Sequence, residues 1–287
     1  MHFKTYKTIL SPKNHLNLYR GCTHGCIYCD SRSDCYQFDH VFEDIQVKSD
    51  ALLILENELR KKRKPAMIGT GAMTDPYMPI EKKLQLTHGA LELIKKYGFG
   101  VSILTKSNQI LADIDLLEEI NQQTKAVIQI TLTTFNEELC KKLEPNVSGT
   151  KDRIEVLKEA QKRYIPTVVW LGPILPFIND SMENLVALLA ACIEVNVKGI
   201  VCFGFGVTMR SGNREYFYQM LDRLFPGMKD KYRGAFGEQY VCNSPHHQKL
   251  MTYFIETCQN AGILWRTEEV FDYLQQFETK DEQLSLF

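Results

Sequence analysis

The chain has 287 residues, of which 44% are hydrophobic and 24% are charged, and its formal net charge is −1 at pH 7. This length and balance predict a soluble globular protein with one large core. No apolar run reaches the ~18 residues of a membrane span, and the opening MHFKTYKTIL lacks the apolar stretch of a secretory signal. We therefore expect a cytoplasmic protein with no membrane partner, and the charge does not indicate extensive neutralisation of phosphates.

The segment GCTHGCIYCDSRSDCY (21–36) contains four of the nine cysteines. The odd count, with most other cysteines isolated in apolar stretches, argues against a disulfide framework and favours a reducing compartment. Cys22, Cys26 and Cys29 form C-x3-C-x2-C, a loop short enough to wrap one compact metal centre. The alternative is a structural zinc site with Cys35 as its fourth ligand, although no second C-x2-C pair follows.

Short apolar segments alternate with helical patterns along most of the chain, which indicates repeated βα units. The predicted strands are 16–20, 66–70, 99–104, 126–133, 166–171 and 199–204. Such parallel strands with right-handed crossovers predict an α/β fold, a partial (β/α)6 TIM-type barrel with its site at the C-terminal ends of the strands. Helices are predicted over 83–97, ending at Gly98, and after Ser181, each with an apolar stripe that belongs to the core. The basic run RKKRK (60–64) is interpreted as a solvated helix end on the far face of the barrel.

The pattern changes after residue 205. We expect one catalytic domain, 1–275, with a barrel core at about 16–205 and a C-terminal extension at about 206–275. Within the extension, a helix is expected to begin after Ser244 and Pro245 and to end at Gly262.

Residues 276–287 are predicted to be a flexible tail, and the chain ends in QLSLF. This peptide resembles the consensus by which bacterial polymerases and repair factors bind the sliding clamp. Apolar anchors filling a pocket beside a polar glutamine suit such docking. The predicted clamp contacts are Gln283, Leu284, Ser285, Leu286 and Phe287.

With Tyr28 as the aromatic residue, the cysteine segment reads C-x3-C-x-aromatic-C, and here the sequence resembles the radical SAM superfamily. The resemblance implies that Cys22, Cys26 and Cys29 hold a [4Fe-4S] cluster whose fourth iron binds S-adenosylmethionine (SAM). It also implies reductive cleavage of SAM to a 5'-deoxyadenosyl radical, with an electron donor such as flavodoxin or ferredoxin.

Three further features, Lys106, LEPNVSGTKDRI (143–154) and GPILPFIND (172–180), together resemble spore photoproduct lyase and related DNA repair photolyases over about 16–205. In that family the arginine matching Arg153 is expected near the SAM carboxylate, and the backbone at 172–174 is expected to hold adenine. The cofactor contacts that the resemblance implies are Tyr28, Thr74, Lys106, Thr131, Thr133, Arg153, Gly172 and Ile174.

One departure from the family concerns the hydrogen donor. Spore photoproduct lyase returns a hydrogen atom from a cysteine shortly after its second strand, where this chain has Met73, which carries no S–H group. Cys242 is the predicted replacement and Cys35 the second choice, with an inert buried cysteine as the alternative for Cys242. The candidate catalytic residues are Cys242, Lys106 and Asp75.

These features together predict a lyase-like radical SAM enzyme that acts on DNA, by lesion repair or base modification. The expected partners are DNA, the bacterial sliding clamp and an electron donor. Two alternatives stay open: a radical SAM enzyme with a peptide or small-molecule substrate, and a non-catalytic metal-bearing module that binds the clamp or nucleic acid.

Overall fold

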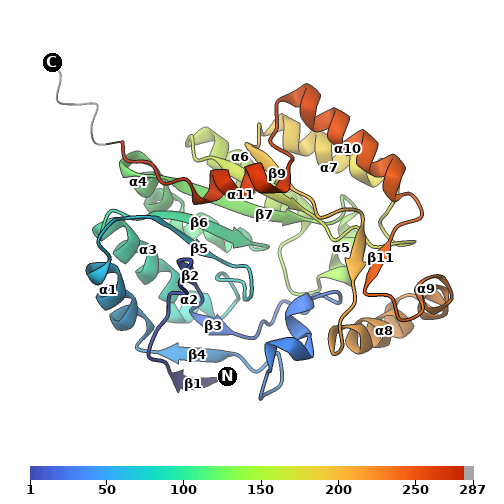
Figure 1. Ribbon diagram of the computed structural model, residues 1–287, viewed down its shortest axis with the longest axis horizontal. Helices are drawn as coiled ribbons and strands as arrows, with labels where there is room; N and C mark the ends of the chain where they lie inside the picture. Colours follow the sequence, from blue (N-terminus) through green and yellow to red (C-terminus); the bar gives the residue numbers. More distant parts are fainter. Residues whose placement is uncertain (281–287) are drawn as a thin grey trace.

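A parallel sheet of six strands forms the centre of the structure, a computed structural model that describes residues 1–280 (Figure 1). The strand order is β2-β5-β6-β7-β8-β9, so β2 and β9 are its open edges. This confirms the α/β class and the partial (β/α)6 barrel. The strands are β2 (His15–Leu16), β5 (Met67–Thr70), β6 (Gly100–Thr105), β7 (Ala126–Leu132), β8 (Thr167–Leu171) and β9 (Gly199–Val201).

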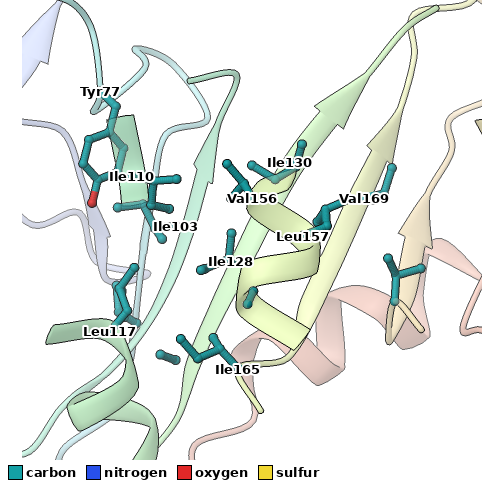
Figure 2. Packing of buried hydrophobic residues seen from close by; sticks show 14 of the residues in the cluster. Tyr77, Ile103, Ile110, Leu117, Ile128, Ile130, Val156, Leu157, Ile165 and Val169 are labelled. Atoms are coloured by element: carbon teal, nitrogen blue, oxygen red, sulfur yellow. The ribbon is translucent and has the colours of Figure 1, made fainter. Parts of the chain in front are cut away.

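Helices pack on the outer face of this sheet. They include α1 (Ala51–Lys61), α3 (Leu86–Lys96), α4 (Ile114–Gln123), α6 (Thr150–Lys162) and α7 (Met182–Glu194). Figure 2 shows Ile128 and Ile130 of β7 beside Leu157 of α6 in the core that results. Every residue of β6 and β7 is buried, because the inner face of the sheet is covered as well.

Helix boundaries confirm two of the expected signals. The Ser181 hydroxyl accepts a hydrogen bond from the Asn184 backbone N–H at 3.1 Å and so caps α7. In the C-terminal extension, α10 (His247–Ala261) ends at Gly262, whose φ of 67° is left-handed. The predicted apolar stripe of α7 is buried.

Two predicted elements are each divided in the structure. The segment 16–20 forms the end of β2 and then β3 (Tyr19–Arg20), which leaves the barrel and pairs with β4 (Gln46–Ser49) in a second sheet of order β1-β4-β3, with β1 at His2–Thr5. The predicted helix 83–97 is divided at Gln85, whose φ of 50° separates α2 (Glu81–Leu84) from α3. At both positions the apolar pattern of the sequence continues without a break, but the backbone of the structure changes direction.

The C-terminal part of the chain covers three different surfaces. Helix α10 lies beside α7 in the outer layer, and α11 (Thr267–Gln275) packs on the inner face of the sheet through Val270 and Leu274 (Figure 1). A ribbon of β10 (Gly206–Thr208) and β11 (Val241–Asn243), with α8 (Asn213–Leu224) and α9 (Met228–Phe236), packs on the segment around Cys26. The short helix α5 (Glu137–Leu143) contributes Leu143 to the same cluster.

Residues 276–280, placed by the sequence in a flexible tail, contact the barrel. Lys125 Nζ lies 2.8 Å from Glu278 Oε1, and the Lys280 backbone N–H donates to Gln123 O at 3.0 Å. The peptide QLSLF (283–287) lies outside the described residues. None of the helices within residues 1–280 combines the length and the apolar character needed to cross a bilayer. The basic run 60–64 lies at the C-terminal end of α1, as predicted.

Candidate active site

The cysteine loop, residues 21–29, follows β3 and is held by distant segments. The Cys22 backbone N–H donates to Phe42 O at 3.1 Å, and the Ile27 N–H donates to Leu143 O at 3.0 Å. These bonds occupy backbone groups that a loop would otherwise leave to solvent. The position of the loop therefore depends on contacts that are far away in the sequence.

The three thiols are close enough to influence one another. Burial raises the pKa of Cys22 to about 12, helped by nearby Asp75 and Cys29, and burial also raises the pKa of Cys26 well above its usual value. Within residues 1–280, no three His, Cys, Asp or Glu side chains converge tightly enough to chelate one metal ion. A four-iron cluster is wider than one ion, and its positive charge supplies the partner that buried thiolates require. The thiols therefore fit the expected cluster.

Asp75 joins the cysteine loop to the sheet. His24, in the middle of that loop, places Nε2 3.0 Å from Asp75 Oδ2, although its N–H is not well aligned with that oxygen, and its Nδ1 lies 3.1 Å from Asn146 O. Burial alone would raise the pKa of Asp75, but His24 and the hydrogen-bond donors lower it to about 2. The carboxylate accepts hydrogen bonds from Tyr77 N (2.9 Å), Thr105 Oγ1 (2.7 Å) and Lys106 N (2.8 Å). These contacts support a positioning role for Asp75, and the catalytic role expected from the sequence stays a prediction.

Glu144 is the second buried carboxylate beside the loop. It accepts a hydrogen bond from the Tyr28 hydroxyl, one from Thr133 Oγ1 at 3.3 Å and one from Arg153 Nη2 at 2.5 Å. Burial would raise the pKa of Glu144, but Arg153 and Lys106 hold it below its usual value. Three predicted cofactor contacts thus meet at a residue that we did not predict.

Arg153 is enclosed by the protein. Its side chain is 0% exposed, and its other hydrogen bonds go to Thr131 O, Ser148 O and Cys140 Sγ. These bonds use four of the five N–H groups of the guanidinium, so most of its hydrogen-bonding capacity is directed at the protein itself. In this arrangement Arg153 holds Glu144, which in turn accepts the hydrogen bond of Tyr28, and the contact of Arg153 with the SAM carboxylate stays a prediction.

Lys106 follows β6 and lies between the two carboxylates. Burial would lower the pKa of its ammonium group, but nearby Cys26 and Glu144 more than offset this effect and raise it. The ammonium group therefore stays charged at neutral pH. Among residues 1–280 no acceptor lies within hydrogen-bond distance of its Nζ, so the cation is available beside the cysteine loop.

The remaining predicted cofactor contacts lie at the C-terminal ends of the strands. Thr74 and Thr131 are buried, and Gly172 directly follows β8 with a φ of 134°. Asn179 holds the adjoining segment: its Oδ1 accepts from Leu175 N at 2.5 Å, and its Nδ2 donates to Thr133 O at 2.8 Å. The segment that contains Ile174 is thereby fastened to the end of β7, and its contact with adenine stays a prediction.

The candidate hydrogen donors are differently placed. Cys242 lies on β11, is 1% exposed and shares an apolar cluster with Cys26 and Tyr28, and burial raises its pKa. Cys35 is exposed, and its sulfur accepts a hydrogen bond from Arg210 Nη1 at 3.3 Å. Met73 is half-buried in the loop after β5. The donor role of Cys242 stays a prediction.

Three functional residues escaped the sequence analysis: His24, Glu144 and Asn179. His24 stands between two cysteines of the metal motif, a position that could have marked it as a loop anchor. Glu144 opens the segment EPN, and Asn179 lies in FIND, but neither has a spacing that identifies its partner. Their partners come from other strands, so only the tertiary structure pairs them.

Comparison with known proteins gives a family and several relatives. The family model described as the radical SAM superfamily matches residues 16–189. An uncharacterized protein of Mycobacterium tuberculosis is 28% identical over 226 residues, which is 76% of this chain and 65% of the relative. A radical SAM Nα-GlyT isomerase of Pseudomonas phage M6 is 27% identical over 261 residues, 90% of this chain and 52% of that protein. The chain thus spans less than two thirds of the length of these curated relatives.

Solved structures share the fold at low identity. Spore photoproduct lyase, in a variant with bound AdoMet and dinucleoside spore photoproduct, aligns with a TM-score of 0.62 at 14% identity, covering 86% of this chain and 74% of that one. The radical S-adenosylmethionine methyltransferase TsrM from Kitasatospora setae aligns with a TM-score of 0.53 at 12% identity, covering 86% and 52%. At these identities the likeness concerns the fold.

Replacing Asp75 by Asn tests its positioning role. Its pKa falls from 3.8 to about 2 on folding, so the carboxylate stabilises the fold fully above pH 3.8, and this contribution is lost as the pH falls through about 2. A shift of this size corresponds to about 2 kcal/mol. Urea unfolding should show Asp75→Asn less stable by at least that amount at pH 7, with a smaller difference at pH 3. Asp272→Asn, which changes an exposed carboxylate on α11, is the control. An equal deficit at both pH values would contradict the assignment.

Replacing the cysteines one at a time tests the metal site. Cys22→Ala, Cys26→Ala and Cys29→Ala should each abolish cluster incorporation, because each removes one iron ligand. Cys35→Ala is the matched control and should keep its iron. Iron and sulfide contents and the visible absorbance after anaerobic reconstitution measure the result. Loss of iron from the Cys35 variant would indicate a fourth protein ligand, and bound zinc in the purified protein would support the structural zinc site.

Proposed function

The chain belongs to the radical SAM superfamily, and we propose that this enzyme acts on DNA, by lyase-like repair of a lesion or by modification of a base. Membership implies a [4Fe-4S] cluster, SAM and an external electron donor. When bound, these supply one-electron cleavage of SAM and hence radical chemistry. We propose flavodoxin or ferredoxin as the donor.

The site itself carries the enzymatic part of the proposal. Cys22, Cys26 and Cys29 would hold the cluster, and the attachments of the loop to Asp75 and Glu144 would keep the thiols in place. Lys106 supplies a fixed positive charge beside them. Such a cation suits an anionic group of a bound cofactor or substrate. The single observation on which this rests is the set of three neighbouring thiols, of which Cys26 is buried, beside a cation that has no hydrogen-bond acceptor for its Nζ among residues 1–280.

Two observations support DNA as the substrate. The spore photoproduct lyase structure that shares this fold holds a dinucleoside photoproduct. On the present chain, Phe135 after β7 and Phe203 after β9 are exposed aromatic side chains beyond the C-terminal ends of strands. Exposed aromatic rings give unpaired bases a surface on which to stack. A phage relative is named a radical SAM Nα-GlyT isomerase, so the proposal is not restricted to the repair of a lesion.

The C-terminal peptide QLSLF supports the same proposal from the sequence alone. A clamp tether raises the effective concentration of the enzyme at DNA, which offsets the absence of net positive charge. The clamp is therefore our proposed protein partner.

DNA as the substrate is tested directly by product analysis. Protein with a reconstituted cluster is incubated anaerobically with SAM, dithionite and either ultraviolet-damaged or undamaged DNA, and the nucleosides are analysed by mass spectrometry. We expect a new nucleoside, or the loss of a lesion, that requires SAM. Cys26→Ala should give neither change. Formation of 5'-deoxyadenosine without any change in either DNA would instead favour a peptide or small-molecule substrate.

Clamp binding is tested with the tail. Leu286→Ala and Phe287→Ala should each weaken binding to a bacterial clamp by about 1–3 kcal/mol, because a few buried anchors carry most of the energy of such contacts. Gln283→Ala should weaken it less. Calorimetric titration measures these affinities, which we expect to be micromolar for a contact of five residues. Deletion of residues 283–287 should leave SAM cleavage unchanged. Absence of binding by the full chain at tens of micromolar would remove the clamp from the proposal.

A further inference from the structure

The loop that follows β5, residues 71–80, is held by a second polar network besides the contacts of Asp75. Residues 74–78 of this loop are all buried. The loop contains Thr74, which is expected to contact SAM, and Asp75, which lies beside the cysteine loop. Contacts that fix the rest of the loop therefore affect the part of the site where the cofactor is expected.

Tyr77 is the side chain that anchors the loop in the core. It is 2% exposed and lies beside Ile103 and Ile110 (Figure 2). Its backbone N–H donates to Asp75 Oδ1 at 2.9 Å, and its hydroxyl donates to Asp113 Oδ2 at 2.8 Å. One residue thus connects the carboxylate beside the cysteine loop with a second buried carboxylate, directly before α4.

Asp113 has one basic partner within residues 1–280, the imidazole of His88. His88 Nδ1 lies 2.6 Å from Asp113 Oδ1. The Asp113 side chain is 7% exposed, whereas that of His88 is 44% exposed and lines an open hollow of about 770 Å³ between α3 and α4. The imidazole can therefore exchange its proton with solvent, while the carboxylate that it compensates lies in the core.

The first turn of α3, which contains His88, also holds the loop directly. The Thr87 hydroxyl donates to Pro76 O at 2.8 Å, and the Thr87 backbone N–H donates to Glu81 Oε1 at 2.6 Å. The other oxygen of Glu81 accepts from the hydroxyl of Tyr19, on the strand that leads into the cysteine loop. A shift of this turn would therefore displace the loop and β3 together.

Three carboxylates surround the Tyr77 hydroxyl. Burial is the main cause that raises the pKa of Tyr77, and Asp113, Glu81 and Asp75 add to it. His88 is the cation that offsets Asp113 in this group of like charges. Without the positive charge, repulsion among the carboxylates is no longer balanced at Asp113, and movement of the loop relieves it.

The surroundings of His88 favour its protonated form. The hydrogen bond with Asp113 raises the pKa of His88 above 6.5 against the effect of partial burial, and Glu92 and Glu81 add to the rise. The charge therefore contributes fully below pH 6.5 and is lost as the pH rises through the raised pKa.

The two lysines in the hollow are engaged by other partners. Lys95 pairs with Glu119, and Lys96 Nζ lies 2.7 Å from Glu56 Oε1 on α1. The charged groups that face His88 are Glu81 on α2, Glu92, Lys95 and Lys96 on α3, and Asp113, Asp115 and Glu119 directly before and on α4, with Arg163 paired to Asp115.

We infer that protonated His88 is a positioning residue for SAM, because through Asp113 and Tyr77 it holds the loop 71–80 in the geometry that binds the cofactor. Loss of its proton loosens the loop and weakens SAM binding. The inference rests on the expected contact of Thr74 with SAM and goes beyond the proposed function, since no substrate enters it.

SAM binding at two pH values tests the assignment. Calorimetry on anaerobically reconstituted protein gives the Kd at pH 6 and pH 9. The amino group of SAM titrates in this range, so the measured quantity is the ratio of variant to wild-type Kd at each pH. His88→Gln, which has no charge, should bind about fivefold more weakly than wild type at pH 6 and equally at pH 9. His88→Lys, charged at both pH values, should match wild type at pH 6 and bind about fivefold more tightly at pH 9.

The matched control is His246→Gln, which changes an exposed imidazole beside α10. It should give a ratio of one at both pH values. An equal ratio for His88→Gln at pH 6 and pH 9 would reduce His88 to a structural contact and overturn the inference. Wild-type affinity of folded His88→Gln at pH 6 would overturn it as well.

Hydrogen exchange in the protein without SAM gives a readout that does not involve the cofactor. After correction for the intrinsic effect of pH, amides of residues 71–80 should exchange faster in His88→Gln than in wild type at pH 6 and equally at pH 9. Tyr77→Phe removes the link to Asp113 and leaves His88 in place, so its exchange should not depend on pH. Melting temperatures show whether each variant is folded, and the His88 variants decide the matter should Tyr77→Phe fail to fold.

The outcomes separate this inference from the proposed function. Altered exchange with unchanged SAM binding would overturn the role of His88 toward the cofactor. Failure to change any DNA would contradict the proposed substrate and leave the SAM titrations as they stand.

Discussion

The buried carboxylate of Asp75 is the constraint on which the site depends. It joins the loop after β5, the end of β6 and the cysteine loop through contacts with Thr105, Lys106 and His24. A buried charge is tolerated only where donors and opposite charges compensate for the loss of water. Here the compensation is sufficient to bring the pKa down to about 2, so the ionised form is the one that the fold requires. The geometry of the cysteine loop follows from this requirement.

A second compensated carboxylate, Glu144, acts on the other side of the loop. It links Tyr28 of the metal motif to Arg153 on α6, and Arg153 reaches back to the backbone at the end of β7. The two carboxylates thus attach the loop to β5 and β6 on one side and to β7 and α6 on the other. Because each contact lies within the protein, the loop can be ordered before any cofactor binds. Preorganisation of this kind lowers the cost of binding.

The extension and α11 give the two sides of the barrel different environments. The ribbon of β10 and β11 with α8 and α9 encloses the cysteine loop in an apolar cluster, which keeps Cys26 and Cys242 away from water. Helix α11 instead covers the inner face incompletely and leaves the polar groups of Ser102 and Gln129 beside aromatic rings. One side therefore encloses the cysteine loop, and the other leaves a cavity of about 110 Å³ between β5 to β8 and α11. The basis of this difference is packing contributed by the last third of the chain.

The sequence by itself determined the barrel and the metal motif, because both are encoded locally. Strand and helix periodicity, the cap at Ser181 and the glycine at 262 act over a few residues, and the spacing of Cys22, Cys26 and Cys29 is contained in one loop. Only the tertiary structure decided the contacts of Arg153 and Asp75. Their chemistry depends on which buried charge lies opposite, and those partners, Glu144 and His24, come from separate segments. The same holds for the cavity, whose walls are strands β5 to β8 and a helix about a hundred residues later, brought together by burial of apolar surface that has no fixed spacing in the sequence.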